Sequence, residues 1–160
     1  ISKFVVRVFD NCKMFCCFRK SSTEIQNPVV WEDTIPFVPK ITSGTVIKVY
    51  DGDTITIATT LAHDSTMYRF SVRLAGIDGP ELKTHNENER KHAIIARDAL
   101  SEKIMGKVVT CKNVSLEKYG RVLADIYYEG LHLNEWMKTN HCVEYHGKTK
   151  EKPKEWFQPI

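Results

Sequence analysis

Three short segments of this chain combine acidic and basic side chains in a way that suits chemistry on a phosphate ester. They read DGDT at residues 51–54, RLAGIDGPE at 73–81 and EKYGR at 117–121. Carboxylate oxygens are ligands for hard cations, and one guanidinium group can bind two phosphate oxygens at once. Without paired cysteine or histidine, such a set favours Ca²⁺ or Mg²⁺ over zinc.

The first segment carries two carboxylates on either side of one glycine. Asp51 and Gly52 are typical of a tight hairpin turn, and that structural role accounts for Asp51 on its own. Asp53 lies two residues further on, where the next strand is expected to begin, and a turn does not explain it. Asp53 is therefore the first candidate metal ligand.

The second segment places Asp78 and Glu81 on either side of Gly79 and Pro80. The proline fixes the backbone and leaves the Gly79 carbonyl free to face a ligand. Carboxylates and a carbonyl are hard oxygen donors, and room for several water molecules would favour Ca²⁺ over Mg²⁺. A solvated turn capped by Asp78 is the alternative for this segment.

Arg73 and Arg121 lie at the ends of expected strands, the first beside an acidic segment and the second inside KYGR. A guanidinium stays charged at every working pH and matches the geometry of phosphate oxygens. Taken singly, each arginine reads as a solvated surface residue. Two of them beside a divalent cation and a free carboxylate would form a phosphodiester site.

The elements that must position these segments are short strands and two helices. Apolar residues recur at three- and four-residue steps from about residue 88 to 105, which predicts a helix ended by Gly106. A second, short helix is expected over residues 131–138. The order strand, strand, strand, helix, strand, strand, helix predicts a five-stranded Greek-key β-barrel of the OB type with helices. The expected strands are residues 45–50, 54–58, 67–77, 107–114 and 121–128.

Two of these elements also predict which side chains face the core. The helical stripe consists of Ala93, Ala96, Leu100 and Ile104. In the strand that begins at Met67, apolar and polar residues alternate with period two. Arg69, Ser71 and Arg73 are therefore expected on the face opposite the core.

The composition fits one small globular domain. The 160 residues are 42% hydrophobic and 27% charged, which excludes a wholly disordered chain, a collagen-like repeat and a bare coiled coil. The net charge of +3 is too small to hold nucleic acid by bulk charge alone. Five cysteines without regular spacing favour reduced thiols, and with them a reducing intracellular compartment.

Four segments resemble the staphylococcal nuclease family, also called thermonuclease-like, in their order and spacing. They are VYDGDTITI, VRLAGIDGPE, EKYGRVLADIY and LNEWM. The resemblance implies an OB-fold barrel and a Ca²⁺-dependent phosphodiesterase, an endonuclease acting on DNA or RNA. It also divides the chain into an N-terminal arm at 1–43, a nuclease domain at 44–146 and a charged tail at 147–160.

The resemblance further implies a role for each site residue. The implied metal ligands are Asp53, Asp78 and the backbone carbonyl of Gly79. The implied catalytic residues are Arg73, Glu81 and Arg121. The implied substrate-binding residues are Lys118, Tyr119 and, less directly, Tyr145. Glu81 would orient or deprotonate the attacking water, and the two arginines would stabilise the transition state.

One departure from the family pattern lies within the implied metal site. The best-known members have threonine where this chain has Gly79. A carbonyl ligand survives this change, but glycine makes the backbone looser and would lower the affinity for the metal.

Two other classes of function compete with this interpretation. A non-catalytic OB-fold module would hold single strands through basic side chains and base stacking, with Tyr68, Tyr127 or Trp136 as platforms. An interaction scaffold would instead act through residues 1–40 and leave the acidic cluster incidental. Separately, Cys16 and Cys17 beside two basic residues are compatible with S-acylation and peripheral membrane contact, the alternative being ordinary thiols in a flexible arm.

Overall fold

The structure is a computed structural model, and it describes residues 29–62 and 65–145. The chain divides into two units, residues 1–35 and 36–160. The described part of the first unit contains a short 3-10 helix, Trp31–Asp33. Cys16, Cys17 and the tail at 147–160 lie outside the described residues. Within the described ranges, no helix is long and apolar enough to cross a membrane.

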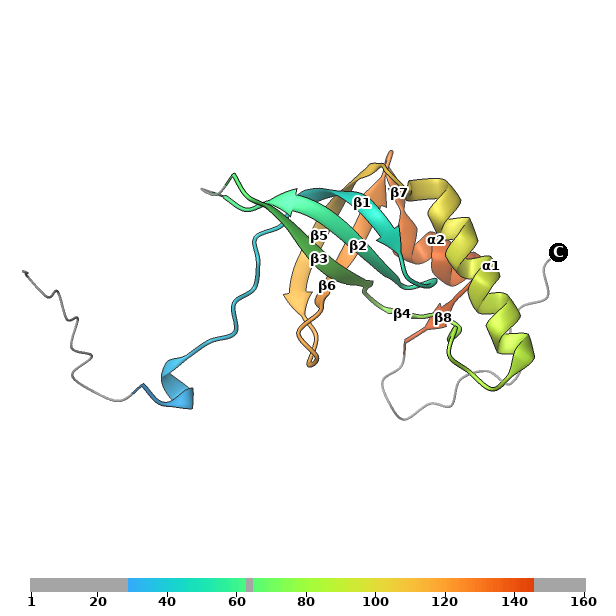
Figure 1. The fold of residues 1–160 in the computed structure, drawn as a ribbon, viewed down its shortest axis with the longest axis horizontal. Coiled ribbons are helices and arrows are strands. Elements are labelled where there is room, and N and C mark those ends of the chain that lie inside the picture. Colours follow the sequence, from blue (N-terminus) through green and yellow to red (C-terminus); the bar gives the residue numbers. More distant parts are fainter. Residues whose placement is uncertain (1–28, 63–64, 146–160) are drawn as a thin grey trace, which may run out of the picture. The chain divides into compact units, whose positions relative to one another are not determined.

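Five long strands of the second unit form the barrel. They are β1 (Ser43–Val49), β2 (Thr54–Thr60), β3 (Met67–Leu74), β5 (Val108–Leu116) and β6 (Val122–Tyr128). The strands pair antiparallel in the order β3-β2-β1-β5-β6, and a parallel pairing of β3 with β6 closes the barrel (Figure 1). The predicted five-stranded barrel of the OB type is confirmed.

Alternating side chains from these strands fill the interior of the barrel. The aligned residues Val49, Ile55 and Val72 are buried, as the period-two pattern requires. One irregularity interrupts β1, where the register shifts between Val46 and Lys48. Because of this bulge, Ile47 and Lys48 are both exposed.

Two helices pack on the barrel beside the turn between β1 and β2 (Figure 1). The first, α1 (Glu87–Ile104), begins at Asn86, whose side chain accepts hydrogen bonds from two backbone N–H groups. The predicted apolar stripe is fully buried, which confirms the helix and its orientation. It consists of Ala93, Ala96, Leu100 and Ile104.

The second helix, α2 (Leu133–Asn140), begins two residues later than the expected start at residue 131. Glu129 and Gly130 have φ values of 48° and 82° and turn the chain back on itself. The next two residues then pair with the end of β6 as a short strand, β7 (Leu131–His132). Backbone pairing with β6 therefore takes the place of the first helical turn.

A second sheet of two short strands joins distant parts of the chain. Strand β4 (Ile77–Asp78) pairs antiparallel with β8 (Val143–Glu144). The Tyr145 N–H extends this pairing by donating to the Gly76 carbonyl at 2.9 Å. The loop that carries Asp78 is therefore held by residues more than sixty positions further along the chain.

Candidate functional site

The turn between β1 and β2 carries the first candidate ligand in a buried position. Asp53 is 3% exposed. One of its oxygens accepts a hydrogen bond from the Thr54 hydroxyl at 2.8 Å, and the other accepts from the Gly79 N–H at 2.9 Å. Asp51 supports the turn locally, since its Oδ1 accepts from the Asp53 N–H at 3.1 Å.

Gly52, in the same turn, packs closely against α1. Its φ is not positive, so the need for glycine comes from this packing and not from the backbone conformation. A Cβ added there would lie 2.9 Å from the Cβ of Ala96 in α1. The expected hairpin between β1 and β2 is confirmed, but its glycine lets the turn lie directly against the helix.

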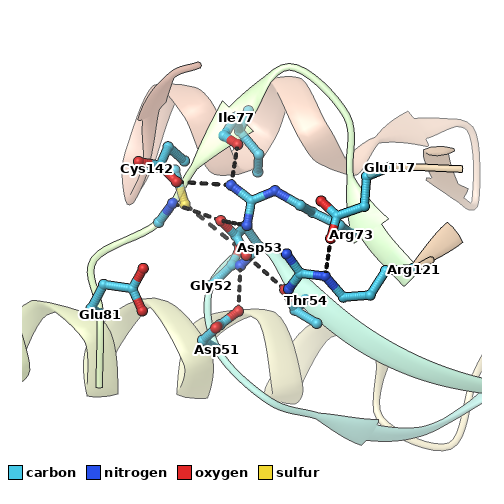
Figure 2. Close-up of polar contacts among 12 residues, drawn as sticks. Asp51, Gly52, Asp53, Thr54, Arg73, Ile77, Glu81, Glu117, Arg121 and Cys142 are labelled. Carbon is cyan, nitrogen blue, oxygen red and sulfur yellow. Dashed lines mark hydrogen bonds and ion pairs between the residues drawn. The ribbon is translucent and has the colours of Figure 1, made fainter. Parts of the chain in front are cut away.

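Arg73, at the end of β3, joins the two acidic segments (Figure 2). Its Nη1 lies 3.0 Å from Oδ2 of Asp53, and its Nη2 lies 2.8 Å from Oδ1 of Asp78. The same Nη2 donates to the Ile77 carbonyl at 3.3 Å. Two carboxylates that are 25 residues apart in the sequence therefore meet on one guanidinium.

Gly79 and Glu81 follow Asp78 in the loop before α1. Gly79 is buried, and its N–H binds Asp53. The Glu81 N–H donates to Oε1 of Glu89 in the first turn of α1 at 3.1 Å. Figure 2 shows Glu81 on the α1 side of the cluster, apart from Arg121.

The third segment forms the turn between β5 and β6. The Arg121 carbonyl accepts from the Glu117 N–H at 3.0 Å, and Gly120 takes a positive φ of 79° within the turn. The Arg121 guanidinium forms a salt bridge with the Glu117 carboxylate (Figure 2). Its side chain is 35% exposed, compared with 16% for Arg73.

A pocket of about 370 Å³ brings both arginines together with the expected substrate-binding residues. Tyr119 and Tyr145 are 71% and 49% exposed, so both rings are accessible in this pocket. The guanidinium carbon of Arg73 lies 5.9 Å from the centre of the Tyr145 ring, and Lys118 Nζ lies 4.8 Å from that of Tyr119. The lining residues that matter here are Arg73, Glu117, Lys118, Tyr119, Arg121 and Tyr145.

Negative charge is concentrated on the other side of Arg73. Burial, followed by the charge of Asp53 and a hydrogen bond with it, raises the pKa of Asp51 from 3.8 to about 7. Burial and then the charges of Asp53, Asp51 and Asp78 raise the pKa of the Cys142 thiol. Burial alone would lower the pKa of Arg73, but the adjacent Asp53 and Asp78 outweigh this effect and raise it. Asp53 and Asp78 thus flank one guanidinium, and Asp51 lies next to Asp53.

This donor set has the chemistry that a hard divalent cation requires. Carboxylate and carbonyl oxygens are the ligands that Ca²⁺ prefers, and the excess negative charge favours a cation. Throughout residues 29–62 and 65–145, no group of three or more His, Cys, Asp or Glu side chains is arranged to hold a metal ion. The described contacts bring Asp53, Asp78 and Gly79 together through Arg73 and the Gly79 N–H. The Glu81 backbone is bound instead to Glu89 of α1.

Several residues that shape the site were not identified from the sequence. Asn134 is buried in α2, where its side chain binds the Ala75 and Ala124 carbonyls and the Ile126 N–H at 2.9–3.1 Å. It therefore ties the end of β3 to β6. Cys142 lies with its Sγ 3.6 Å from the Gly52 carbonyl. Neither residue has a local pattern that reveals such a contact, whereas Glu117 could have been paired with Arg121 from their opposite charges.

Comparison with known proteins identifies the family. The model of staphylococcal nuclease homologues matches residues 71–154, more than half of the chain. An "uncharacterized endonuclease" of Escherichia coli is 30% identical over 95 residues, 59% of this chain and 54% of that protein. A "probable staphylococcal-like nuclease" of Oryza sativa subsp. japonica is 36% identical over 89 residues, 55% of this chain and 22% of that protein.

A "probable endonuclease" of Schizosaccharomyces pombe is 36% identical over 58 residues, which cover 36% of this chain and 25% of that protein. The matched region therefore spans about half the length of the E. coli relative and a quarter or less of the other two. The match to the family model includes Arg73, Asp78 and Arg121, three of the residues in the cluster and pocket. This chain belongs to the staphylococcal nuclease homologue family.

Proposed function

We propose that this protein is a Ca²⁺-dependent nuclease that hydrolyses phosphodiester bonds of DNA or RNA. The observation that carries the proposal is the position of Arg73, which holds two carboxylates and lines a pocket that also contains Arg121. Oxygen donors for a cation and guanidinium groups for a phosphate thus lie next to each other. The family relationship supports the same class of reaction.

In the proposed mechanism, Asp53, Asp78 and the Gly79 carbonyl hold the cation. When bound, Ca²⁺ supplies positive charge beside the phosphate. Arg73 and Arg121 bind the nonbridging oxygens and stabilise the charge that grows on them in the transition state. Glu81 orients a water molecule and takes up its proton as the water attacks phosphorus; the P–O bond to the leaving ester oxygen breaks, and that oxygen takes up a proton from solvent.

The pocket residues position the substrate next to this centre. Lys118 and Arg121 supply positive charge, while Tyr119 and Tyr145 present exposed rings. The salt bridge between Arg121 and Glu117 must give way, at least in part, when a phosphate binds the guanidinium. In the free protein, both arginines therefore form salt bridges with carboxylates before substrate binds.

The decisive assay measures cleavage of supercoiled plasmid and of single-stranded RNA with EDTA and with a Ca²⁺ series. We expect EDTA to abolish cleavage and added Ca²⁺ to restore it, with activity favouring neutral to alkaline pH because the ligands must be ionised. Glu81→Gln should reduce the rate strongly, whereas Glu102→Gln, an exposed glutamate of α1, serves as the control. Cleavage by Glu81→Gln at the parent rate, or cleavage that is independent of metal and fastest in acid, would contradict the proposal.

The competing non-catalytic module predicts tight binding of single strands without cleavage under any metal. Two of its expected stacking platforms are already engaged within the protein. The Tyr127 ring stacks on the His132 ring with centres 4.5 Å apart, and the Trp136 ring packs against the His141 ring with centres 5.5 Å apart. The same assay, combined with a binding measurement, separates the two functions.

A further inference from the structure

Strands β1, β2 and β3 lie side by side and form one sheet of the barrel wall (Figure 1). The strand register places residues on this face in cross-strand rows. One row aligns Lys48, Thr56 and Ser71, and the next aligns Thr45, Ala58 and Arg69. Directly opposite residues of neighbouring antiparallel strands point to the same side, so these rows share one surface.

Arg73 connects this surface to the candidate site. Residues at every second position of a strand share a face, so Ser71 and Arg69 follow Arg73 along the outer side of β3. Arg69 lies four residues from Arg73, or about 13 Å along the strand. Both Ser71 and Arg69 are exposed, as predicted for side chains on the face of β3 opposite the core.

Among the described residues of this face, the charged side chains are all basic: Lys48, Arg69 and Arg73. The cross-strand neighbours of Arg69 are the small residues Ala58 and Thr45. The residues between the positive charges are therefore short and uncharged, and no carboxylate of the three strands competes for Lys48 or Arg69. Such a surface suits a flexible polyanion that lies along the sheet.

An exposed aromatic ring lies where this face approaches the acidic turn. Tyr50 is 44% exposed and directly precedes Asp51. The Lys48 ammonium group lies 5.6 Å from the centre of the Tyr50 ring. A cation beside an accessible aromatic ring is the pair of features with which OB-fold proteins hold single-stranded nucleic acid, through phosphate contact and base stacking.

We propose that the β1–β2–β3 outer face binds single-stranded nucleic acid that extends from the cleavage pocket, through Lys48, Tyr50 and Arg69. This inference rests on the proposed nuclease function and adds a binding path to it. The path lies outside the pocket, so it contributes mainly to the binding of long substrates. A dinucleotide confined to the pocket would not reach Arg69.

The direct test measures binding of a fluorescein-labelled, single-stranded 20-nucleotide DNA by anisotropy in EDTA, across a range of salt concentrations. The variant is the double substitution Lys48→Ala and Arg69→Ala. The loss of two phosphate contacts should make the slope of log K against log salt shallower by about 1.4 and weaken binding about ten- to thirty-fold at 0.1 M salt. A second double variant, Lys91→Ala with Arg97→Ala, removes two positive charges from α1 and serves as the matched control.

The stacking component has its own pair of variants. Tyr50→Ala should weaken binding by about tenfold, and Tyr50→Phe should restore it because phenylalanine keeps the aromatic face. If the Lys48 and Arg69 double variant matches the α1 control in both affinity and salt slope, the proposed path is wrong. Failure of the unsubstituted protein to bind the oligonucleotide would also overturn it.

Cleavage assays distinguish failure of this path from failure of the nuclease proposal. With Ca²⁺, the Lys48 and Arg69 double variant should lose more kcat/KM on the 20-nucleotide strand than on a dinucleotide. An equal loss on both substrates would overturn the path while leaving the nuclease proposal intact. If the unsubstituted protein cleaves neither substrate, the nuclease proposal fails, and the metal-free binding experiment still decides whether this face binds nucleic acid.

Discussion

The two arginines of the candidate site are held in different ways. Arg73 is 16% exposed and is fixed by two carboxylates and a backbone carbonyl. Arg121 is 35% exposed and is held by the single carboxylate of Glu117 within its own turn. Arg73 is thus expected to stabilise the folded protein as well as to contribute to the proposed chemistry. The second can change partners without disturbing the core, so stability and activity should respond differently to the loss of each.

Arg73→Ala should have the largest effect, because it leaves the buried Asp53 and the partly buried Asp78 without their shared counter-charge. We expect a loss of about 3–5 kcal/mol in the free energy of unfolding, together with loss of activity. Chemical denaturation measures the first quantity. Arg97→Ala is the control, since that arginine pairs with Asp98 on the surface of α1 and should cost less than about 1 kcal/mol. Equal losses in the two variants would refute the architectural role of Arg73.

Arg121→Ala should affect activity far more than stability. Removal of one preorganised donor typically lowers the rate by about 10²–10³, or ~2.7–4 kcal/mol of transition-state stabilisation. The half-exposed pair with Glu117 should contribute no more than about 1 kcal/mol to folding. Initial rates on plasmid DNA with Ca²⁺, measured beside a denaturation curve, check both numbers. An Arg121→Ala variant that unfolds as readily as Arg73→Ala would remove the distinction between the two arginines.

Gly52→Ala tests whether the turn that carries Asp53 is held against α1. The added methyl group would overlap the Cβ of Ala96 at 2.9 Å, so we expect a loss of about 1–3 kcal/mol. Gly79→Ala is the matched control on the other side of Asp53, where the nearest atoms lie at 3.5 Å and φ is not positive. That substitution should be neutral or stabilise the protein by about 0.4–1 kcal/mol. The opposite order of the two effects would contradict the packing described for this turn.

Asp51→Asn tests the repulsion between the neighbouring carboxylates Asp51 and Asp53. The folded pKa of about 7 lies above the ordinary value of 3.8, so the folded state binds more protons between these two values. The contribution of Asp51 to stability therefore decreases as the pH rises from about 4 to about 7. Allowing for solvent screening, we expect Asp51→Asn to stabilise the metal-free protein by about 1–2 kcal/mol at pH 8 and by little at pH 4.

Denaturation in EDTA at pH 4 and pH 8 measures this difference. Asp98→Asn, a substitution of an exposed aspartate on α1 that pairs with Arg97, removes a surface carboxylate and should lower stability by no more than about 1 kcal/mol at either pH. A gain for Asp51→Asn that is the same at both pH values would show that Asp51 is not destabilised by ionisation in the folded protein.

The barrel and its helices could be predicted from the sequence because their signals are local. The three- and four-residue steps of α1 identify a buried face, and the structure confirms it. The alternation within β3 holds at Val72 and Leu74, which are buried, whereas Tyr68 is 37% exposed. The helical pattern predicts a start of α2 that is two residues too early, because backbone pairing of Leu131 and His132 with β6 competes with it. That competition depends on the neighbouring strand and leaves no mark in the helical periodicity.

The site was predicted as a set of residue types, and its internal connections were not. The carboxylates and arginines were found because their combination is unusual. The support from Asn134, the contact of Cys142 with Gly52 and the pairing of β4 with β8 join residues that are more than fifty positions apart. Contacts of that kind are set by tertiary packing, and the sequence around each residue does not encode them.

The pairing of β4 with β8 also has a consequence for folding during translation. Asp78 enters a two-strand sheet whose partner includes Val143, and Tyr145 completes the hydrogen bonding at Gly76. On the ribosome, Asp78 emerges long before Val143 and Tyr145 do. The nascent chain can therefore form β1, β2 and β3 while the loop with Asp78 still lacks its partner strand. The candidate site would in this way be completed only after most of the domain has left the ribosome.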